Sequence, residues 1–520
     1  MDIDRAEGRA FNRRAFLLGA VGATAASVLA ACSQPSQPAA TSAPAGAAPT
    51  KPAAASPAAS PAAAGSPAAS PAASPAASPA ASPAASPAAS PAASPAASPA
   101  AAAASPTAAP GGVTLANPPA VPNASRQYAG TTIVYYGDGV GMGNDLDKAA
   151  AQRFQQDTGI TVNVIPRPQS STDTFAQYQR FFQGQSPDLD VFMVDVIWPG
   201  AFAPNLVDLG PKLGDAAKQH YEGIVANNTV NGALVAMPFF SDFGILYYRS
   251  DLLQKYNISA PPKTWDELAQ QANTVTNGEK ASNPNIGGFV FQGNAYEGLT
   301  CNALEWLASS GGGMIVENGK ATVNNPQAAA ILNTVRGWIG SVAPRGVTTY
   351  QEEESRNAFQ TGNAVFMRNW PYAYPLGNAA DSPVKGKFDV APLPASSGQN
   401  SVGCIGGWAL AVSKYSKNQD ASIEFIRYLS SPEFMTFRGI LGGFVPTIQS
   451  VADNPNVQQA QPYLAKLSNV QRVARPSAET GENYNQVSTA FFQGVNQILN
   501  GQDASSILPN TQNQIQRLLS

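Results

Sequence analysis

The sequence predicts an α/β fold behind an export leader and a long spacer. Runs rich in β-branched and aromatic residues at 131–136, 160–165 and 189–194 alternate with helical stretches at 144–157 and 172–183. Strands that alternate with helices of this length imply parallel βαβ units, with helices packed against the sheet. We therefore expect an α/β domain to begin at about residue 126.

Residues 1–32 have the layout of a signal peptide. Arg13 and Arg14 precede an apolar run that ends in Leu-Ala-Ala before Cys32. The arginine pair resembles a twin-arginine signal, and Leu-Ala-Ala-Cys resembles the lipobox of bacterial lipoproteins. The run is too short for a stable spanning helix, and no later stretch is apolar for long enough to cross a bilayer. We expect an exported protein that lipidated Cys32 anchors to the outer face of the cell membrane; an uncleaved anchor is the alternative.

Residues 33–125 form the predicted spacer. Ser-Pro-Ala-Ala repeats with a period of four from residue 66 to about 101, in a segment with almost no charge. Such a composition cannot bury enough apolar surface to fold, and its prolines favour extended polyproline II. We expect a disordered, passive tether; glycosylation of its serines is left open.

Composition excludes several classes of function. Residues 126–520 are long enough for two domains, the whole chain has a net charge of −3, and no basic stripe occurs. A nucleic-acid partner is therefore not expected. His220 is the single histidine, which excludes a zinc site built on several histidines. Because it lies in a polar helical stretch, we expect it on the surface, and we expect neither a metal nor a cofactor.

Two cysteines remain besides the lipobox residue. Cys301 and Cys404 lie in the exported part of the chain, where a disulfide is chemically favoured. A bridge between them is the expectation, and two buried free thiols are the alternative.

Acidic residues follow the predicted strands. Asp138 comes after the first strand and Asp195 closes the third. Ligands bind outside the carboxyl ends of the strands in open parallel sheets, so both are candidate ligand contacts. Asp138 lies between two glycines, where a turn role is equally expected. Asp242 lies in an apolar run, and a carboxylate there needs hydrogen-bond donors from protein or ligand.

Aromatic residues gather at two further places. The stretch MRNWPYAYP at 367–375 contains two prolines that exclude a helix, so Trp370 and Tyr372 lie on a loop. Gly407 precedes Trp408, and glycine lets the backbone approach another group closely. We expect both tryptophans at a binding surface; a core position is the alternative for Trp408.

The chain from about residue 130 onward resembles the extracellular solute-binding proteins of bacterial ABC importers. The stretches that carry the resemblance are FQQDTGITVNV, VDVIW, MPFFSDFGILYYRSDLL, PPKTWDEL, EGLTCNALEWLASSGG, FQTGNAVFMRNWPYAY, GGWALAVS and GGFVPT. They are most similar to the sugar-binding group, in its trehalose/maltose-binding branch. The resemblance implies a two-lobed, type II periplasmic-binding-protein-like fold with a hinge and an interlobe cleft. Lobe 1 would comprise 126–238 and 406–448, and lobe 2 would comprise 239–405 and 449–520.

The resemblance and the aromatic loop together predict ligand contacts from both lobes. The expected contacts are Asp138, Asp195, Phe240, Asp242, Glu297, Trp370, Tyr372, Gly407, Trp408, Arg475 and Tyr484. The two indoles would stack on sugar faces, Asp242 would accept hydrogen bonds from hydroxyl groups, and Arg475 would donate them. Some relatives would have a tyrosine at the position of Phe240, so this chain lacks one hydroxyl donor. Glu297 could instead serve only to begin a helix.

The implied function is reversible capture of a carbohydrate. A disaccharide such as trehalose or maltose would bind in the cleft, the lobes would close, and the closed form would deliver the sugar to the permease of an ABC importer. No covalent chemistry is needed, and the sequence lacks a GxxxxGK[ST] phosphate loop. We expect a monomer that is not an enzyme. The alternatives are another solute (a polyol, an oligosaccharide or a glycosyl phosphate) or a lipoprotein glycosidase that uses Asp195 and Asp242.

Overall fold

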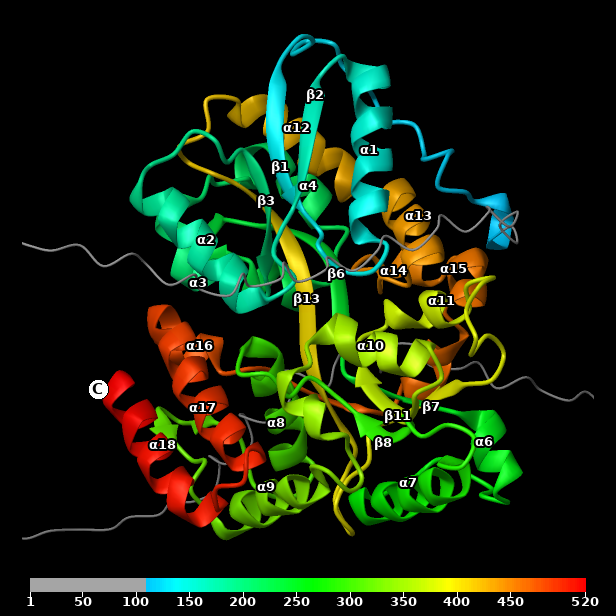
Figure 1. The fold of residues 1–520 in the computed structure, drawn as a ribbon. Coiled ribbons are helices and arrows are strands. Elements are labelled where there is room, and N and C mark those ends of the chain that lie inside the picture. Colours follow the sequence, from blue (N-terminus) through cyan, green and yellow to red (C-terminus); the bar gives the residue numbers. More distant parts are fainter. Residues whose placement is uncertain (1–108) are drawn as a thin grey trace, which may run out of the picture. The chain divides into compact units, whose positions relative to one another are not determined.

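The computed structural model describes residues 109–520. The predicted leader, Cys32 and the spacer up to residue 108 lie outside the described residues and stay predictions. The described part contains two larger β-sheets, called the first sheet and the second sheet below, with helices packed on each (Figure 1). None of the helices at 109–520 combines the length and the apolar character needed to cross a bilayer.

The first sheet begins with the predicted βαβ units. Its parallel strands, with β1 in the middle, are β1 (Thr132–Gly137), β2 (Thr161–Pro166) and β3 (Val191–Asp195). The helices after β1 and β2 are α1 (Gly143–Thr158) and α2 (Ser171–Gln183). The predicted strands and helices are confirmed. Because parallel strands end at one edge of the sheet, Asp138 and Asp195 both lie at that edge.

Two long strands continue the first sheet. These are β6 (Met237–Phe243) and β13 (Val402–Val412), which pair antiparallel with each other. The last residues of β13 pair antiparallel with β3, and its first residues pair in parallel with β14 (Gln471–Val473). Val402 and Cys404 at the start of β13 pack into the hydrophobic cluster beside the second sheet. Strand β13 therefore runs from the first sheet to the core of the second, as Figure 1 shows.

The second sheet has the order β12-β7-β11-β8. Its strands are β7 (Ile245–Tyr248), β8 (Gly287–Val290), β11 (Ala364–Asn369) and β12 (Asp389–Ala391). Gly244 separates β6 from β7, and a Cβ atom there would lie 1.9 Å from Glu305 Oε1 and 2.5 Å from Arg368 Nη2. Only glycine lets the chain pass from the first sheet to the second beside this buried ion pair.

Hydrophobic residues cover both faces of the first sheet. In β3, Val191 and Met193 belong to one cluster, and Phe192 and Val194 belong to another. This alternation follows from the two-residue period of a strand. Neighbouring residues of β7 alternate between two clusters in the same way. Burial of both faces explains why these strands read as continuous apolar runs.

The other elements connect and cover the sheets. The helices are α3 (Pro199–Phe202), α4 (Gly210–Ala217), α5 (Glu222–Asn227), α6 (Ser250–Lys255), α7 (Trp265–Glu279), α8 (Glu297–Ala308), α9 (Pro326–Trp338), α10 (Glu352–Gln360), α11 (Ala373–Gly377), α12 (Gln419–Leu429), α13 (Pro432–Gly442), α14 (Gln449–Ala452), α15 (Pro455–Ala460), α16 (Ser477–Thr480), α17 (Tyr484–Leu499) and α18 (Ala504–Leu518). Short paired strands are β4 (Thr229–Val230), β5 (Ala233–Leu234), β9 (Val316–Glu317) and β10 (Lys320–Ala321). The capping box that Thr264 and Glu267 predict at the start of α7 is present.

Candidate ligand-binding site

A buried cavity brings together residues from distant parts of the chain. It is lined by Val140, Arg167, Gln169, Ser171, Asp195, Phe240, Asp242, Glu297, Gly298, Cys301, Glu352, Trp370, Tyr372, Gly406, Gly407, Trp408, Phe444 and Arg475. Nine of the eleven expected ligand contacts lie on it; Asp138 and Tyr484 do not. Its volume of about 60 Å³ is room for a few water molecules only, so a sugar needs the walls to move apart.

The two expected tryptophans both reach the cavity, and both are half-buried. Trp370 directly follows β11, and its indole N–H donates to Glu352 Oε1 at 3.3 Å. Trp408 lies on β13, edge-on to Trp198 with 5.3 Å between ring centres. The structure therefore places both tryptophans at the cavity and not in the core.

An arginine covers one face of each indole. The guanidinium carbon of Arg368 lies 3.9 Å from the ring centre of Trp370, and that of Arg167 lies 3.9 Å from the ring centre of Trp408. Such stacking is a favourable cation–π contact when it is shielded from water. Only the opposite face of each indole is left for a ligand to stack on.

Asp242 has an unused hydrogen-bond acceptor in the cavity wall. Its side chain is on β6, the residue is 8% exposed, and no donor in the described part of the chain reaches its Oδ1. Burial raises the pKa of this carboxyl well above its ordinary value, with further increases from the charges of Asp138 and Asp195. Arg368 and Arg438 oppose the shift. A buried carboxylate with an unpaired oxygen is stabilised by taking up a proton or by accepting a hydrogen bond from a ligand.

Glycine allows the backbone to come close beside Asp242. Gly407 has a φ of 121°, and a Cβ atom there would lie 2.6 Å from the carbonyl oxygen of Phe240. At Gly406 the Cβ atom would lie 3.0 Å from the ring of Trp370. The Gly406–Gly407 pair therefore lets β13, β6 and the indole meet at one wall of the cavity.

Arg475 joins two carboxylates across the cavity. It donates to Asp195 Oδ1 at 2.7 Å and to Glu297 Oε1 at 2.9 Å. Glu297, at the first position of α8, also accepts from the hydroxyl of Tyr484 and from Ser488 at 2.7 Å. Burial raises the pKa of Glu297, while the charge of Arg475 lowers it. Tyr484 thus lies behind Glu297 and not on the cavity wall.

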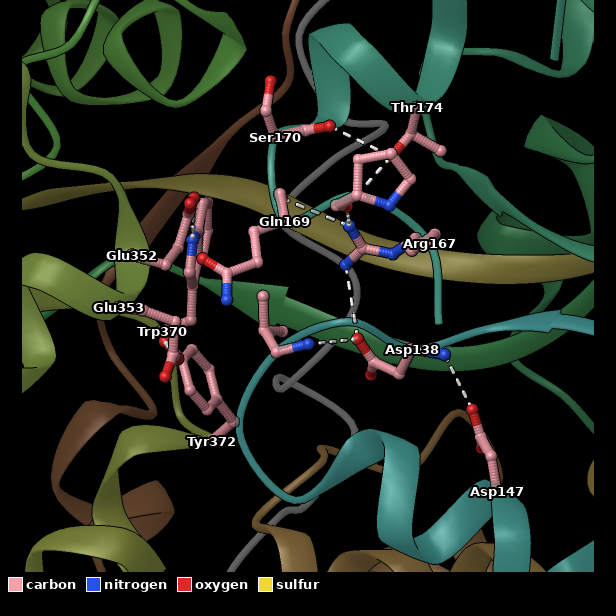
Figure 2. A network of polar contacts seen from close by, with 12 residues as sticks. Asp138, Asp147, Arg167, Gln169, Ser170, Thr174, Glu352, Glu353, Trp370 and Tyr372 are labelled. Carbon is pink, nitrogen blue, oxygen red and sulfur yellow. Dashed lines mark hydrogen bonds and ion pairs between the residues drawn. The ribbon is translucent and has the colours of Figure 1, made fainter. Parts of the chain in front are cut away.

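Asp138 also lies one contact behind the cavity. It is fully buried, and its carboxylate pairs with Arg167 at 3.3 Å and with Arg438 at 2.8 Å. Arg438 pairs in turn with Asp147 at 2.7 Å. Figure 2 shows the Asp138 carboxylate accepting from Arg167, while the backbone amide of Asp138 donates to the Asp147 carboxylate. In this structure Asp138 orients Arg167 and does not reach the cavity.

The cavity includes residues that the sequence reasoning missed. Arg167, Gln169 and Ser171 lie just after β2, and Glu352 is the first residue of α10. Figure 2 shows Gln169 between Arg167 and the pair Glu352–Trp370. The strand-end rule that indicated Asp138 and Asp195 would have indicated the segment after β2 as well. No comparable local signal marks Glu352.

The expected disulfide is not formed. Cys301 and Cys404 are both buried free thiols, and Cys301 lines the cavity. The pKa of Cys301 is raised well above its ordinary value, first by a hydrogen bond with Cys404 and then by burial. The two thiols are therefore neighbours, as a bridge would need, but they are not joined, and the raised pKa of Cys301 disfavours its reactive thiolate.

His220 is not the surface residue that the polar sequence around it predicted. It is 6% exposed, and its Nδ1 lies 2.8 Å from the hydroxyl oxygen of Thr447. Burial lowers its pKa to about 4. His220 is thus a neutral packing residue, and it does not line the cavity.

Comparison with known proteins identifies the family. The model described as bacterial extracellular solute-binding protein matches residues 136–436. A relative from Deinococcus radiodurans, named a probable ABC transporter-binding protein, is 46% identical over 385 residues, which are 73% of this chain and 92% of the relative.

Solved structures agree with this match. Maltose-bound MalE3 of T. maritima is similar with a TM-score of 0.71 and 38% sequence identity, covering 75% of this chain and 100% of that one. A solute-binding protein of Thermotoga lettingae bound with α-D-tagatose has a TM-score of 0.67 at 22% identity, with coverage of 75% and 100%. The predicted two-lobed type II fold is confirmed; the trehalose/maltose branch stays a prediction. Because the family match spans more than half of the chain, this protein belongs to the bacterial extracellular solute-binding proteins.

Proposed function

We propose that this protein captures a carbohydrate outside the cytoplasm and delivers it to the permease of an ABC importer. The observation that carries the proposal is the pairing of two half-buried indoles with the unpartnered carboxylate of Asp242 on one cavity. Sugars offer apolar C–H faces that stack on aromatic rings, together with hydroxyl groups that donate to carboxylates. Binding without covalent change is the role of this protein family, so we propose no enzymatic activity.

A disaccharide such as maltose or trehalose is the proposed ligand. MalE3, which is 38% identical to this chain, was solved with maltose bound. Trp370 and Trp408 would each offer their one uncovered face to a sugar ring, which suits a ligand with two rings. Phe240 lines the same cavity without a hydroxyl group, so that wall supplies apolar contact only.

Capture would involve closure of the two lobes about the three segments that connect them. These are β6, β13 and a third connecting segment, called the third crossing. We propose the division at 126–238 with 406–448 and 239–405 with 449–520, with one adjustment. Helices α14 and α15 share a hydrophobic cluster with α13. Gln461 donates to Gly439 and Phe444, whereas Tyr463 packs in the cluster of the second sheet. The third crossing therefore falls between Gln461 and Tyr463.

Two contacts would hold the closed form together. The ion pair of Arg475 with Asp195 and the hydrogen bond from Glu297 N–H to Thr172 Oγ1 at 3.1 Å both join residues of different proposed lobes. A ligand that adds contacts only when the lobes are closed shifts the population toward that form. Recognition of the closed form by the permease would then couple capture to transport.

The cellular setting follows from the family and from the leader. Extracellular location is characteristic of the family, and we propose that the twin-arginine-like leader exports the chain and that Cys32 carries a lipid anchor. The spacer would let a monomeric binding domain move relative to the membrane surface.

Thermal unfolding of the purified full-length protein tests the proposal. Maltose, trehalose and sorbitol are added in turn at millimolar excess, because a ligand specific to the folded state raises the melting temperature. A rise with a disaccharide, together with heat release and no release of reducing sugar from trehalose, supports a binding protein. No response to any of a panel of mono- and disaccharides would contradict the proposal, and release of glucose from trehalose would favour the glycosidase.

A further inference from the structure

Every guanidinium around the cavity already has a carboxylate partner. Arg475 pairs with Asp195 and Glu297, as described above. The remaining pairs are Arg167 with Asp138, Arg368 with Glu305, and Arg438 with both Asp138 and Asp147. The guanidinium groups in these pairs have side-chain exposures of 1–3%. These cations are held in desolvated pairs that compensate their charge, although the Nε atoms of Arg167, Arg438 and Arg475 have no hydrogen-bond partner in the described part of the chain.

Two carboxylates on the cavity have no such partner. Asp242 and Glu352 take part in no ion pair among residues 109–520. Glu352 accepts from neutral donors only, the hydroxyl of Tyr296 at 2.6 Å and the indole of Trp370 at 3.3 Å. Asp242 Oδ1 has no donor within this described range. The cavity therefore has more carboxyl groups than cationic partners for them, and one carboxyl oxygen that no donor among the described residues reaches.

The groups that surround Asp242 do not remove this excess. The charged residues that act on Asp242 are the acids Asp138 and Asp195 and the arginines Arg368 and Arg438. Both cations are committed to other carboxylates. A sugar hydroxyl would donate to Asp242 Oδ1 but would not compensate the charge of an ionised carboxylate. An ammonium group would do both, and charge-assisted hydrogen bonds are stronger than neutral ones.

We propose that this pocket prefers a carbohydrate that carries a protonated amine, seated on Asp242, over the neutral or anionic sugar of the same shape. The inference rests on the proposed function and names the chemical class within it. Because its hydroxyl groups fill the same positions, the neutral sugar also binds, but more weakly. The sugar phosphate is rejected, because its charge adds to that of Asp242 and Glu352 in a site without a free cation.

Calorimetric titration of the full-length protein near neutral pH tests this inference. The probes are trehalose and maltose, their monoamino-monodeoxy derivatives, and their 6-phosphates. We expect at least one amino derivative to bind about tenfold more tightly than its parent, and the phosphates to bind roughly a hundredfold more weakly. Amino derivatives that all bind more weakly than their parents, or phosphates that bind as well as the parents, would overturn the inference and leave the proposed function standing. If no probe of any charge binds, the proposed specificity for maltose or trehalose fails, and with it this inference.

The Asp242→Asn variant locates the preference. It keeps the shape and removes the charge, so the advantage of the amino derivative over its parent should disappear. Asp215→Asn is the matched control, because the Asp215 carboxylate is 97% exposed and does not line the cavity; it should keep the full advantage. An advantage that survives in Asp242→Asn would contradict the assignment.

The unmodified protein gives an independent measurement if Asp242→Asn fails to fold. Binding of the neutral sugar should weaken as pH rises through the raised pKa of Asp242, because closure over an uncompensated carboxylate requires proton uptake. Binding of the amino derivative should be nearly independent of pH until the amine loses its proton, because the cation replaces that proton. Parallel pH profiles for the two ligands would overturn the inference.

Discussion

The guanidinium of Arg368 lies 3.9 Å from the ring centre of Trp370 and covers one face of this indole. Arg368 is itself held by two hydrogen bonds to Glu305, at 2.6 and 2.8 Å, and by one to Gln292 at 3.0 Å. A side chain clamped in this way has one orientation. Trp370 is therefore fixed from behind, and its other face is presented to the cavity as a rigid surface.

The first prediction concerns the two indoles. Trp370→Ala and Trp408→Ala should abolish the sugar-induced rise in melting temperature, because each removes a stacking surface and leaves its cationic partner exposed in the site. Both residues are half-buried, so the far-UV circular dichroism of the ligand-free variants should be unchanged. Trp370→Phe is the conservative control and should keep part of the response. Variants that respond like the parent protein would show that the indoles do not contact the ligand.

The second prediction separates the stability role of Arg368 from its positioning role. Arg368→Met leaves Glu305 buried without its cation, which should lower the free energy of unfolding by about 3–5 kcal/mol. Adding Glu305→Gln should recover much of that loss, because no buried charge is then left unpaired. Sugar affinity should remain low in both variants, since Trp370 has lost its support. Urea unfolding and calorimetry measure the two quantities; recovery of affinity together with stability would show that Arg368 acts only on stability.

The third prediction concerns the pH dependence of the ligand-free protein. The pKa values of Asp242, Glu297 and Glu352 are raised, in each case chiefly by burial. A carboxyl with a raised pKa in the folded state adds stability below its unfolded pKa, and this contribution is lost as pH rises through the folded value. Asp242→Asn should flatten that decline and raise the melting temperature at the high-pH end of it. A steeper decline in the variant would mean that Asp242 is stabilised as an anion.

The fourth prediction concerns His220 and has the opposite sign. Its pKa is lowered to about 4 by burial, so the folded state holds the neutral ring. The stability contributed by this residue is present above the unfolded pKa of about 6.5 and is lost as pH falls toward 4. His220→Gln, which can still bond to Thr447, should lose less stability between these pH values than the parent protein. If the variant and the parent protein lose equal stability, His220 is exposed to water in the folded protein.

The fifth prediction tests the state of the two cysteines. Alkylation of the unfolded protein without reductant should modify both Cys301 and Cys404, because the structure contains two free thiols. In the folded protein the same reaction should be slow, since both thiols are buried and the pKa of Cys301 is raised. Peptide mass spectrometry reads the outcome at each residue. Peptides that stay joined until a reductant is added would show that Cys301 and Cys404 form the disulfide that the exported location favours.

Local sequence signals predicted the first sheet well. The β-rich runs and the capping box at Thr264 predicted elements that the structure contains, because period, turn residues and caps are local properties. The ordered motifs correctly predicted the family, and most of the residues that they indicated line one cavity. The resemblance indicated Phe240, the apolar run indicated Asp242, and the preceding glycine indicated Trp408; the structure brings them together on the paired strands β6 and β13.

Other parts of the site could not be predicted from local signals. Asp138 and Asp195 both follow parallel strands, yet only Asp195 reaches the cavity, because two arginines surround Asp138. His220 looked exposed because its neighbours in the chain are polar, and it is buried by a residue more than two hundred positions away. Glu352 became part of the site only through the packing of α10 against β11.

The sequence by itself determined the family, the alternation of strands and helices, and the set of side chains suited to a sugar. Those are properties of spacing and residue type, which a linear chain carries in full. Only the tertiary structure decided which carboxylates are neutralised and which faces of the indoles stay open. Arg368, Arg438 and Arg475 each lie dozens to hundreds of positions from the acids they pair with. Coulombic and hydrogen-bond energies depend on distances of a few ångströms, and folding alone sets those distances between residues so far apart in the chain.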